Sequence, residues 1–380
     1  MTTCQNTQDT MVLNSGPLTT QNRRKRVKLI ASFRHGTGVR IPVVLWFILV
    51  LCLWLSTALA QQSQSITQVR ALGSIGMTVS DMNRSVDFYT KLLSFEAVSD
   101  IELAGTEYEH LLGVFGLRIR IVHLKLGDES IRLTQYVAPP DGRSIPVASN
   151  SYDLWFQHIA IVVSDMERAY QRVRKHRVRQ ISTSPQTLPK SNKPAAGIKA
   201  FKFRDPDGHA LELLWFPPGK GSPKWHGQTN TLFLGIDHTA IAVSDSEASL
   251  KFYRGMLGMK VLGGSLNVGT EQEHLDNVFG ARVRVTGVGP PVYPPHVEFL
   301  QYETPPGGRA MPRDTRANDL WHWQTHLVVD NVDKVAKGLR ENKVQFVSNQ
   351  VRTLPDDRLG FRKGIMVLDP DGHAMLIVEK

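Results

Sequence analysis

Two copies of one turn sequence lead into segments that differ in a chemically capable residue. "DPDGHALELLWF" begins at Asp205 and "DPDGHAMLIVEK" at Asp369. Three residues after its His, the first copy carries Glu212, whereas the second carries Leu376. A carboxylate in an apolar run destabilises the fold unless a charged group meets it. The difference raises the question of which charged partner Glu212 meets and why the second copy needs none.

The cysteine distribution narrows the chemistry. The two cysteines, Cys4 and Cys52, both precede residue 61. The body of the chain therefore holds no disulfide, no thiolate metal site and no Cys nucleophile. A metal site there must use His, carboxylate or amide ligands.

Composition indicates a globular protein that does not bind nucleic acid. The 380 residues are enough for two domains with cores of their own. Of these residues, 41% are hydrophobic and 21% are charged, as in globular proteins. Seven of the 45 Lys and Arg residues, and one of the 35 acidic residues, lie in residues 1–60, which leaves a formal charge of only +4 for the rest. Beyond residue 60 there is no long basic stripe of the kind that nucleic-acid binding needs.

Residues 1–60 have the pattern of a targeting segment. A polar, basic lead is followed by an uncharged apolar run from Ile41 to Ala60. Ala58 and Ala60 form the small-x-small pattern of a signal-peptidase site, ahead of the polar "QQSQS". We therefore expect cleavage near Ala60 and an exported protein, periplasmic or secreted. The alternative is a single-pass membrane anchor, because about 20 apolar residues can span a bilayer.

The rest of the chain contains a four-fold internal repeat. Each copy has a short apolar strand, an Asp or Asn, and an amphipathic helix, followed by alternating runs that predict three more strands. The helix starts are marked by capping residues at Asp81, Asp165, Asp245 and Asn331. The buried stripes expected on two of the helices are Met166, Ala169, Tyr170 and Val173, and Val332, Val335 and Leu339.

A longer period of 164 residues lies over this repeat. "EYEHLLGVFGLRIRIV" at 107–122 matches "EQEHLDNVFGARVRVT" at 271–286, and "DPDGHA" recurs with the same offset. The predicted domains are 70–216 and 233–380, joined by a Pro/Gly-rich linker at 217–232. Their four modules are 70–136, 154–216, 233–302 and 321–380, numbered 1 to 4 below. Each module has a one-sided sheet, so modules are expected to pair.

The βαβββ modules, with "GIDHTAIAVSD" opening one copy and "DPDGHALELLWF" closing another, resemble the vicinal oxygen chelate superfamily of glyoxalases, bleomycin resistance proteins and dioxygenases. The resemblance covers residues 70–380. It implies an α+β fold in which four βαβββ modules pair into two cupped mixed sheets. It also implies one divalent metal ion, held by residues of the first and last strands of paired modules.

Carried over by position, the resemblance implies first-strand positions at Ser74, His158, His238 and Gln324 and last-strand positions at Arg132, Glu212, Glu298 and Leu376. If module 2 pairs with module 3, and module 1 with module 4, the eight positions divide into one site with four metal ligands and one site without them. One site then holds the ligands His158, Glu212, His238 and Glu298, with Glu212 and Glu298 also the catalytic residues, and the other site has lost its metal. Pairing in sequence order, which gives two half-sites, stays open, as does a ligand role for His326 if the register differs.

Other repeated polar residues have structural interpretations. His209 and His373 follow the "DPDG" turn in both copies and are read as parts of the turn. Glu109-His110 and Glu273-His274 also occur in both copies, and a structural role is favoured over a place in the pocket.

The function that follows is a metal-dependent lyase or isomerase of the glyoxalase or epimerase type, acting on a small molecule with vicinal oxygens through an enediolate. Nickel, zinc, cobalt, manganese and iron all suit such ligands. Export fits poorly with glutathione or coenzyme A thioesters as substrates. Two alternatives remain open: an extradiol-type iron dioxygenase, and a resistance-type protein that binds a small molecule without turnover.

Overall fold

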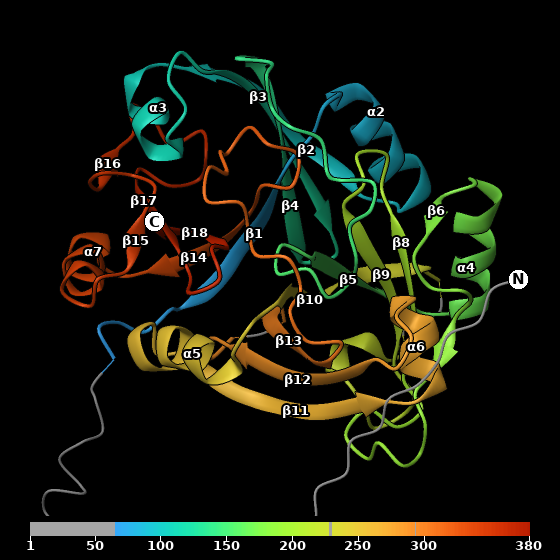
Figure 1. The fold of residues 1–380 in the computed structure, drawn as a ribbon. Coiled ribbons are helices and arrows are strands. Elements are labelled where there is room, and N and C mark those ends of the chain that lie inside the picture. Colours follow the sequence, from blue (N-terminus) through green and yellow to red (C-terminus); the bar gives the residue numbers. More distant parts are fainter. Residues whose placement is uncertain (1–64, 228–229, 293) are drawn as a thin grey trace, which may run out of the picture. The chain divides into compact units, whose positions relative to one another are not determined.

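The computed structural model describes residues 65–227, 230–292 and 294–380. The targeting segment, the cleavage position near Ala60 and the alternative anchor lie outside the described residues. Within the described part, no helix combines the length and apolar composition that crossing a membrane requires. Figure 1 shows the fold with its elements labelled.

The four modules have related element orders. Module 1 holds β1 (Ala71–Thr78), α2 (Met82–Asp87), η1 (Phe88–Leu92), β2 (Glu96–Ala104), α3 (Thr106–Leu112), β3 (Arg118–Leu126) and β4 (Glu129–Ala138). Module 2 holds β5 (Gln157–Val163), α4 (Met166–Lys175), β6 (Arg179–Gln180), β7 (Gln186–Thr187), β8 (Lys199–Arg204) and β9 (Ala210–Trp215), with the short η2 (Pro223–Trp225) after it.

The second half repeats this order. Module 3 holds β10 (Phe233–Ala242), α5 (Ser246–Leu250), η3 (Lys251–Met256), β11 (Lys260–Val268), α6 (Thr270–Asp276), β12 (Arg282–Gly289) and β13 (His296–Thr304). Module 4 holds β14 (Trp323–Val329), α7 (Val332–Glu341), β15 (Gln345–Phe346), β16 (Arg352–Thr353), β17 (Lys363–Leu368) and β18 (Ala374–Glu379).

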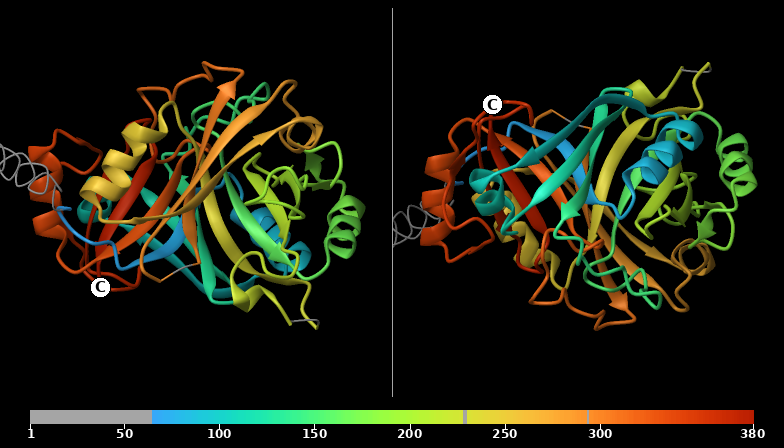
Figure 2. Two further views of the ribbon diagram at one scale, coloured as in Figure 1. Left: turned by 90° about the horizontal axis from the view of Figure 1, so that it is seen from below. Right: turned by 90° about the horizontal axis from the view of Figure 1, so that it is seen from above.

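The strands form two sheets that each combine modules from different halves of the chain. In the inner sheet, built from modules 2 and 3, the order is β11-β12-β13-β10-β5-β9-β8-β6, and β7 pairs with β8. In the outer sheet, built from modules 1 and 4, the order is β15-β17-β18-β14-β1-β4-β3-β2, and β16 pairs with β17. Figures 1 and 2 show the C-terminal strands in red beside β1 in blue. The predicted fold of paired βαβββ modules is confirmed, and the pairing is inner with inner and outer with outer.

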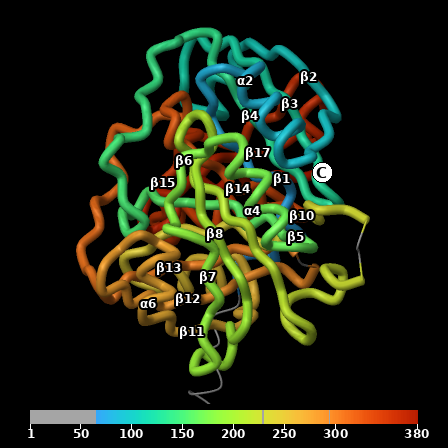
Figure 3. Tube along the Cα trace, turned by 90° about the vertical axis from the view of Figure 1, so that its right-hand side faces the viewer, coloured from blue at the N-terminus to red at the C-terminus, as the bar shows by residue number. Residues whose placement is uncertain are grey.

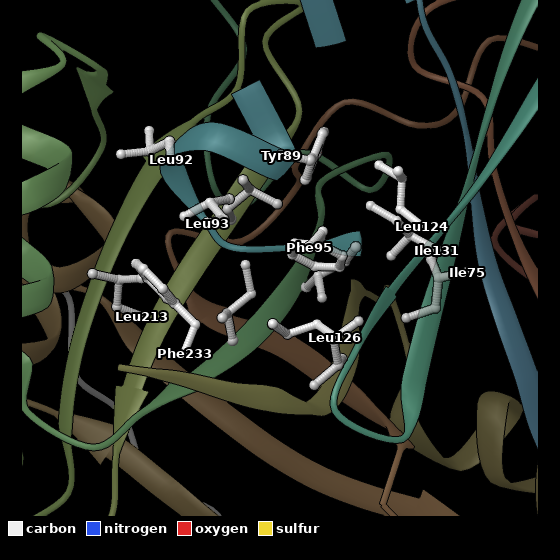
Figure 4. Packing of buried hydrophobic residues seen from close by; sticks show 14 of the residues in the cluster. Ile75, Tyr89, Leu92, Leu93, Phe95, Leu124, Leu126, Ile131, Leu213 and Phe233 are labelled. Atoms are coloured by element: carbon white, nitrogen blue, oxygen red, sulfur yellow. The ribbon is translucent and has the colours of Figure 1, made fainter. Parts of the chain in front are cut away.

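The faces of the sheets that carry the helices pack together in a different combination of modules, mainly 1 with 2 and 3 with 4. One core is built mainly from modules 1 and 2, with Phe233 added by module 3, and the close-up in Figure 4 shows Tyr89, Leu93 and Phe95 packed in this core with Leu213 and Phe233. A second core joins modules 3 and 4. Accordingly, α2 and α4 lie on one side of Figure 1, and α5 and α7 lie on the other. Each module thus shares a sheet with one neighbour and a core with another. Figure 3 shows β1–β4, β14 and β17 above β7, β8 and β11–β13.

The expected capping residues begin the helices. The side chains of Asp81, Asp165, Asp245 and Asn331 accept hydrogen bonds from backbone N–H groups in the first turns. In α4 and α7 the expected stripe residues are buried, except that Tyr170 is half-buried. The short helices α3 and α6, which contain Glu109-His110 and Glu273-His274, were not predicted as helices.

One linker joins modules 1 and 2, and another joins modules 3 and 4. Each linker holds the other through an ion pair between an Arg and a buried Asp, and we call these two pairs the clamps. The Arg143 guanidinium donates two hydrogen bonds to the buried Asp319, at 2.9 and 2.7 Å. Arg309 does the same to the buried Asp153, at 2.9 and 2.6 Å. Such bidentate charged pairs fix geometry as well as adding attraction.

Each clamp depends on a close backbone approach by a glycine. A Cβ added at Gly142 would lie 1.9 Å from the Asn318 carbonyl oxygen, and one at Gly308 would lie 1.7 Å from that of Tyr152. A side chain at either position would therefore separate the linkers.

The repeated "DPDGH" turns also tie the halves together. His209 donates from Nδ1 to Asp205 Oδ2 at 2.8 Å, and its Nε2 lies 2.7 Å from the Leu320 carbonyl of the other half. His373 contacts Asp369 and the Leu154 carbonyl in the same way. This geometry agrees with the structural reading of both histidines.

Candidate metal centre

The register of the strands places the four candidate ligands together. In the inner sheet β5 pairs antiparallel with β10, so that His238 lies opposite Ala160 and Ala240 lies opposite His158. The parallel partners of Ala160 and Ala240 are Glu212 on β9 and Glu298 on β13. Because alternate residues of a strand share a face, all four side chains project into one concavity, which we call the inner cup.

The ligand atoms of this set lie close to one another. His158 Nε2 is 3.3 Å from Glu212 Oε2, and His238 Nε2 is 3.8 Å from the same oxygen. His238 Nε2 is 3.4 Å from Glu298 Oε2. One ligand atom from each of His158, Glu212 and His238 lies within 4.8 Å of the others. The four side chains line a cavity of ≈ 610 Å³, counting its open mouth.

The imidazole nitrogens that face the cup have carboxylates nearby but no well-formed hydrogen bond among the described residues. Both nitrogens of His158, and Nε2 of His238, are buried without a hydrogen-bond partner among the described residues. Buried polar groups are normally satisfied, so such orphans call for a missing ligand. Two imidazoles and two carboxylates are donors that suit a borderline divalent cation, so the residues present fit a metal ion.

A second set of polar residues orients His238. The Asp237 carboxylate lies 3.0 Å from His238 Nδ1, and the Trp225 indole N–H donates to the same carboxylate at 2.9 Å. A carboxylate behind an imidazole fixes the tautomer and directs the other nitrogen toward a metal. Asp237, His238 and His296 also have ligand atoms within 4.8 Å of one another. His296 Nε2 is 3.5 Å from Glu298 Oε1.

A buried lysine lies next to Glu212. Lys202 Nζ donates to Asp276 on α6 at 2.7 Å and lies 3.9 Å from Glu212 Oε1. Asp276 also accepts hydrogen bonds from Gln272 at 2.6 Å and from the Tyr302 hydroxyl at 2.5 Å. Glu212 therefore meets two cationic neighbours, His238 and Lys202, and this answers why its carboxylate is tolerated in an apolar strand.

The ionisation states of the side chains in the inner cup favour the binding of a cation. Burial alone would raise the pKa of Glu212, but His158 and Lys202 outweigh it and the pKa lies below its ordinary value. Burial opposes the charged form of Glu298 too, yet His238 and His296 lower its pKa to about 2. Burial lowers the pKa of His158. Both carboxylates are thus anionic at neutral pH, and His158 is neutral.

The corresponding positions of the outer sheet lack this set. Gly76 pairs with Arg132, and His326 pairs with Leu376, in the register that Ala160 and Glu212 have in the inner sheet. Ser74 therefore stands where His238 stands in the inner sheet, Gln324 stands where His158 stands, and His326 is offset from the ligand position. Ser74 Oγ and Gln324 Nε2 both lie 3.1 Å from nitrogens of His326. Among the described residues of this cup, no cluster of three or more potential metal ligands occurs.

Several residues of the inner cup were not found from the sequence: Lys202, Asp276, Asp237 and His296. A comparison between repeats carries the signal for two of them. At the 164-residue offset Lys202 corresponds to Met366 and Asp276 corresponds to Leu112. At these two positions the inner modules thus carry residues of opposite charge, whereas the outer modules carry two apolar residues. Nothing comparable marks Asp237 or His296 as partners of His238.

We predict that removing either imidazole from the cup removes the metal. His158→Ala and His238→Ala should each lower zinc affinity by more than the ~10–100-fold typical of losing an outer-shell partner. Ser74→Ala and Gln324→Ala, at the equivalent outer positions, are the matched controls and should keep the wild-type content. Elemental analysis after dialysis against a chelator measures this. Metal loss in the Gln324 variant would contradict the assignment to the inner cup.

We also predict that zinc binding releases a proton from His238. Burial favours the neutral imidazole, but Glu298, Asp237 and Glu212 raise the pKa of His238 to about 9 in the metal-free protein. Since the folded pKa lies above the ordinary value of 6.5, this group stabilises the metal-free fold fully below pH 6.5 and ceases to do so as pH rises through 9. A bound cation needs the neutral form, so affinity should rise about tenfold per pH unit from 7 to 9.

Calorimetry of zinc binding in two buffers of different ionisation enthalpy measures this proton. Close to one proton per ion is expected at pH 7.5, and fewer in Glu298→Gln, which lacks the neighbour that raises the pKa most. Zinc binding without proton release in the wild-type protein would show that His238 is neutral beforehand.

Comparisons with known proteins agree with this architecture. The structure is similar to that of a glyoxalase I variant from Zea mays, with a TM-score of 0.53, 18% sequence identity, and coverage of 82% of this chain and 93% of that chain. It is similar to glyoxalase I from Zea mays itself, with a TM-score of 0.50, 17% identity, and coverage of 82% and 92%. No curated protein sequence matches the chain significantly. These similarities concern the fold.

The sequence comparison extends to the family. The family model of the Glyoxalase/Bleomycin resistance protein/Dioxygenase superfamily matches residues 71–213 and 235–377, which include the strands and helices of all four modules. The chain belongs to the Glyoxalase/Bleomycin resistance protein/Dioxygenase superfamily.

Proposed function

We propose that the protein is a metal-dependent lyase or isomerase that moves a proton between adjacent carbons of a small substrate with vicinal oxygens, by way of an enediolate. The observation that carries this proposal is the convergence of two buried imidazoles and two carboxylates on one cavity, with imidazole nitrogens that have no hydrogen-bond partner in the part of the chain that the structure describes. A divalent cation bound there would supply Lewis-acid stabilisation of the negative charge that develops on the substrate oxygens.

The chain's own residues would carry the proton. Glu212, whose pKa is held below its ordinary value, is ionised and faces the cavity, so it is suited to accept a proton from carbon and return it to the neighbouring carbon. Lys202, fixed by Asp276 on α6, would keep Glu212 in its basic form. Asp237 would hold the His238 ring in place. Gln272 and Leu275 of α6 close the cavity on the side of β8 and would limit the entry of water.

An extradiol-type dioxygenase is the second candidate. The cluster of His158, His238 and Glu212 has the two-His, one-carboxylate composition of non-haem iron sites. Glu298, 3.4 Å from His238, adds a fourth donor that would occupy a position needed by oxygen or a catechol. For that reason the isomerase chemistry is preferred. Iron in protein purified without added metal, together with oxygen uptake in the presence of a catechol, would favour the second candidate.

We predict that Glu212→Gln lowers turnover by about 10²–10⁴-fold while most of the metal is retained. The amide keeps the size and one oxygen donor but is not a base. Suitable probes are the hemithioacetals that phenylglyoxal forms with glutathione and with 2-mercaptoethanol, assayed in deuterated water after loading with nickel or zinc. Proton NMR of the product then reports solvent deuterium at the carbon that gained the proton.

A comparison with Glu298→Gln shows which carboxylate carries the proton. If Glu212 does so, the Glu298 variant should lose less activity than the Glu212 variant at equal metal content. A Glu212→Gln protein with full activity would contradict the assignment of the base. Absence of both product and deuterium exchange with either thiol and either metal would reject the glyoxalase-type reaction.

We further propose that the protein acts outside the cytoplasm after removal of residues 1–60. The support is the uncharged run from Ile41 to Ala60 with its Ala-Leu-Ala end. N-terminal sequencing of the protein recovered from its native compartment is expected to begin near Gln61. Recovery from membranes with the apolar run intact would favour the anchored alternative.

A further inference from the structure

The concavity of the outer sheet, which we call the outer cup, has walls unlike those of the inner cup. Its cavity occupies ≈ 520 Å³, counting its open mouth, and is lined mainly by apolar and aromatic side chains. At the positions of the inner-cup residues Gln272, Asp276 and Lys202 it carries Tyr108, Leu112 and Met366. The outer modules therefore have a buried apolar surface where the inner modules have a buried polar network, and Tyr108, Leu359 and Phe361 belong to one hydrophobic cluster of this surface.

One cationic side chain, that of Arg132, lies among these apolar residues and has no ion-pair partner among the described residues. Arg132 occupies on β4 the position that Glu298 occupies on β13, and it lines the cavity. Its Nη1 atom is buried and has no hydrogen-bond partner among the described residues, and no described carboxylate contributes to its pKa. The chain passes close over it at Gly360, where an added Cβ would lie 3.4 Å from Nη2.

The nearest titratable groups around Arg132 are the imidazoles of His123 and His326 and the hydroxyl of Tyr136, and none of them supplies a negative charge at neutral pH. Burial, followed by the charge of Arg132, lowers the pKa values of His123 and His326. The hydrogen-bond chain from Ser74 through His326, Gln324 and His322 is consistent with neutral imidazoles. Burial lowers the pKa of Arg132 itself to about 10, so its guanidinium stays charged at neutral pH.

An unpaired buried guanidinium lowers the stability of the fold, and it is tolerated where an anion completes it. The fork of donors on a guanidinium matches the two oxygens of a carboxylate. Thr134 and Tyr136 alternate with Arg132 along β4 and bring two hydroxyl groups to the same lining. The aromatic and aliphatic walls lie beside this guanidinium and would face an apolar body attached to the carboxylate.

We propose that the outer cup is a binding site for a small organic monocarboxylate with an apolar or aromatic body, and that Arg132 binds the carboxylate. The site is separate from the inner cup and uses none of its proposed ligands. A guanidinium on the last strand of module 1 thus stands where module 3 has the carboxylate of Glu298, so the outer position suits an anion and the inner one a cation. Neither the proposed turnover nor the proposed metal is required for it.

The test is a titration of the full, zinc-loaded chain with benzoate and hexanoate, followed by calorimetry or ligand-observed NMR. Benzamide, which has the shape of benzoate but no charge, is the matched probe and should bind at least ~10-fold more weakly. Arg132→Leu should weaken benzoate binding by about 10–100-fold, the range for a hydrogen bond to a charged group, and abolish the preference over benzamide. His158→Ala, in the inner cup, should leave benzoate binding unchanged.

Two further measurements keep the proposal independent of folding defects. Arg132→Leu removes an uncompensated buried charge, so without ligand its unfolding temperature should equal or exceed that of the wild type. Leu376→Glu places a carboxylate in the same cavity, where it should pair with Arg132 and exclude benzoate from a folded protein. Benzoate binding that survives Arg132→Leu, that is lost in His158→Ala, or that is absent at millimolar concentration in the wild type would overturn the proposal.

Discussion

The antiparallel pairing of β5 with β10 is the contact on which the candidate metal centre depends. It joins strands from different halves of the chain and places Ala240 opposite His158 and His238 opposite Ala160. A shift of one residue would turn one imidazole to the helical face of the sheet. The small residues opposite each His leave the space into which both rings project. Neither half of the chain holds the set alone, because each contributes one His and one Glu.

The remaining architecture fixes this pairing from outside. Sequence neighbours share a hydrophobic core through their helical faces, whereas partners in a sheet come from opposite halves. The reciprocal clamps of Arg143 on Asp319 and of Arg309 on Asp153 tie the linkers across the halves. The buried His209 and His373 reach the carbonyl groups of Leu320 and Leu154, so each turn is also anchored to the other half. All four modules therefore help to hold the inner cup in place, although only modules 2 and 3 supply its ligands.

Much of this was predictable because repetition supplies a register. The cap residues, the strand alternation and the 164-residue offset led to the paired sheets, and the pattern of His and Glu favoured the inner pairing. The partners of these residues were harder to predict. Lys202 and Asp276 are 74 positions apart and meet only because α6 folds over β8. Asp237 acts on the residue next to it through a side-chain direction that sequence periodicity does not specify. Arg132 was recognised as a departure from the ligand pattern, but its isolation became evident only from the walls around it.

We infer that one metal ion binds between β5 and β10 and that the outer cup binds none. A crystal structure of the zinc-loaded protein, with anomalous data collected at the zinc edge, tests this most directly. We expect one anomalous peak per chain in the inner cup, about 2.0–2.1 Å from a nitrogen of His158 and of His238, with Glu212 and Glu298 completing the protein ligands. A peak beside Gln324 or His326 in the outer cup, or a zinc ion in the inner cup that contacts neither imidazole, would contradict it.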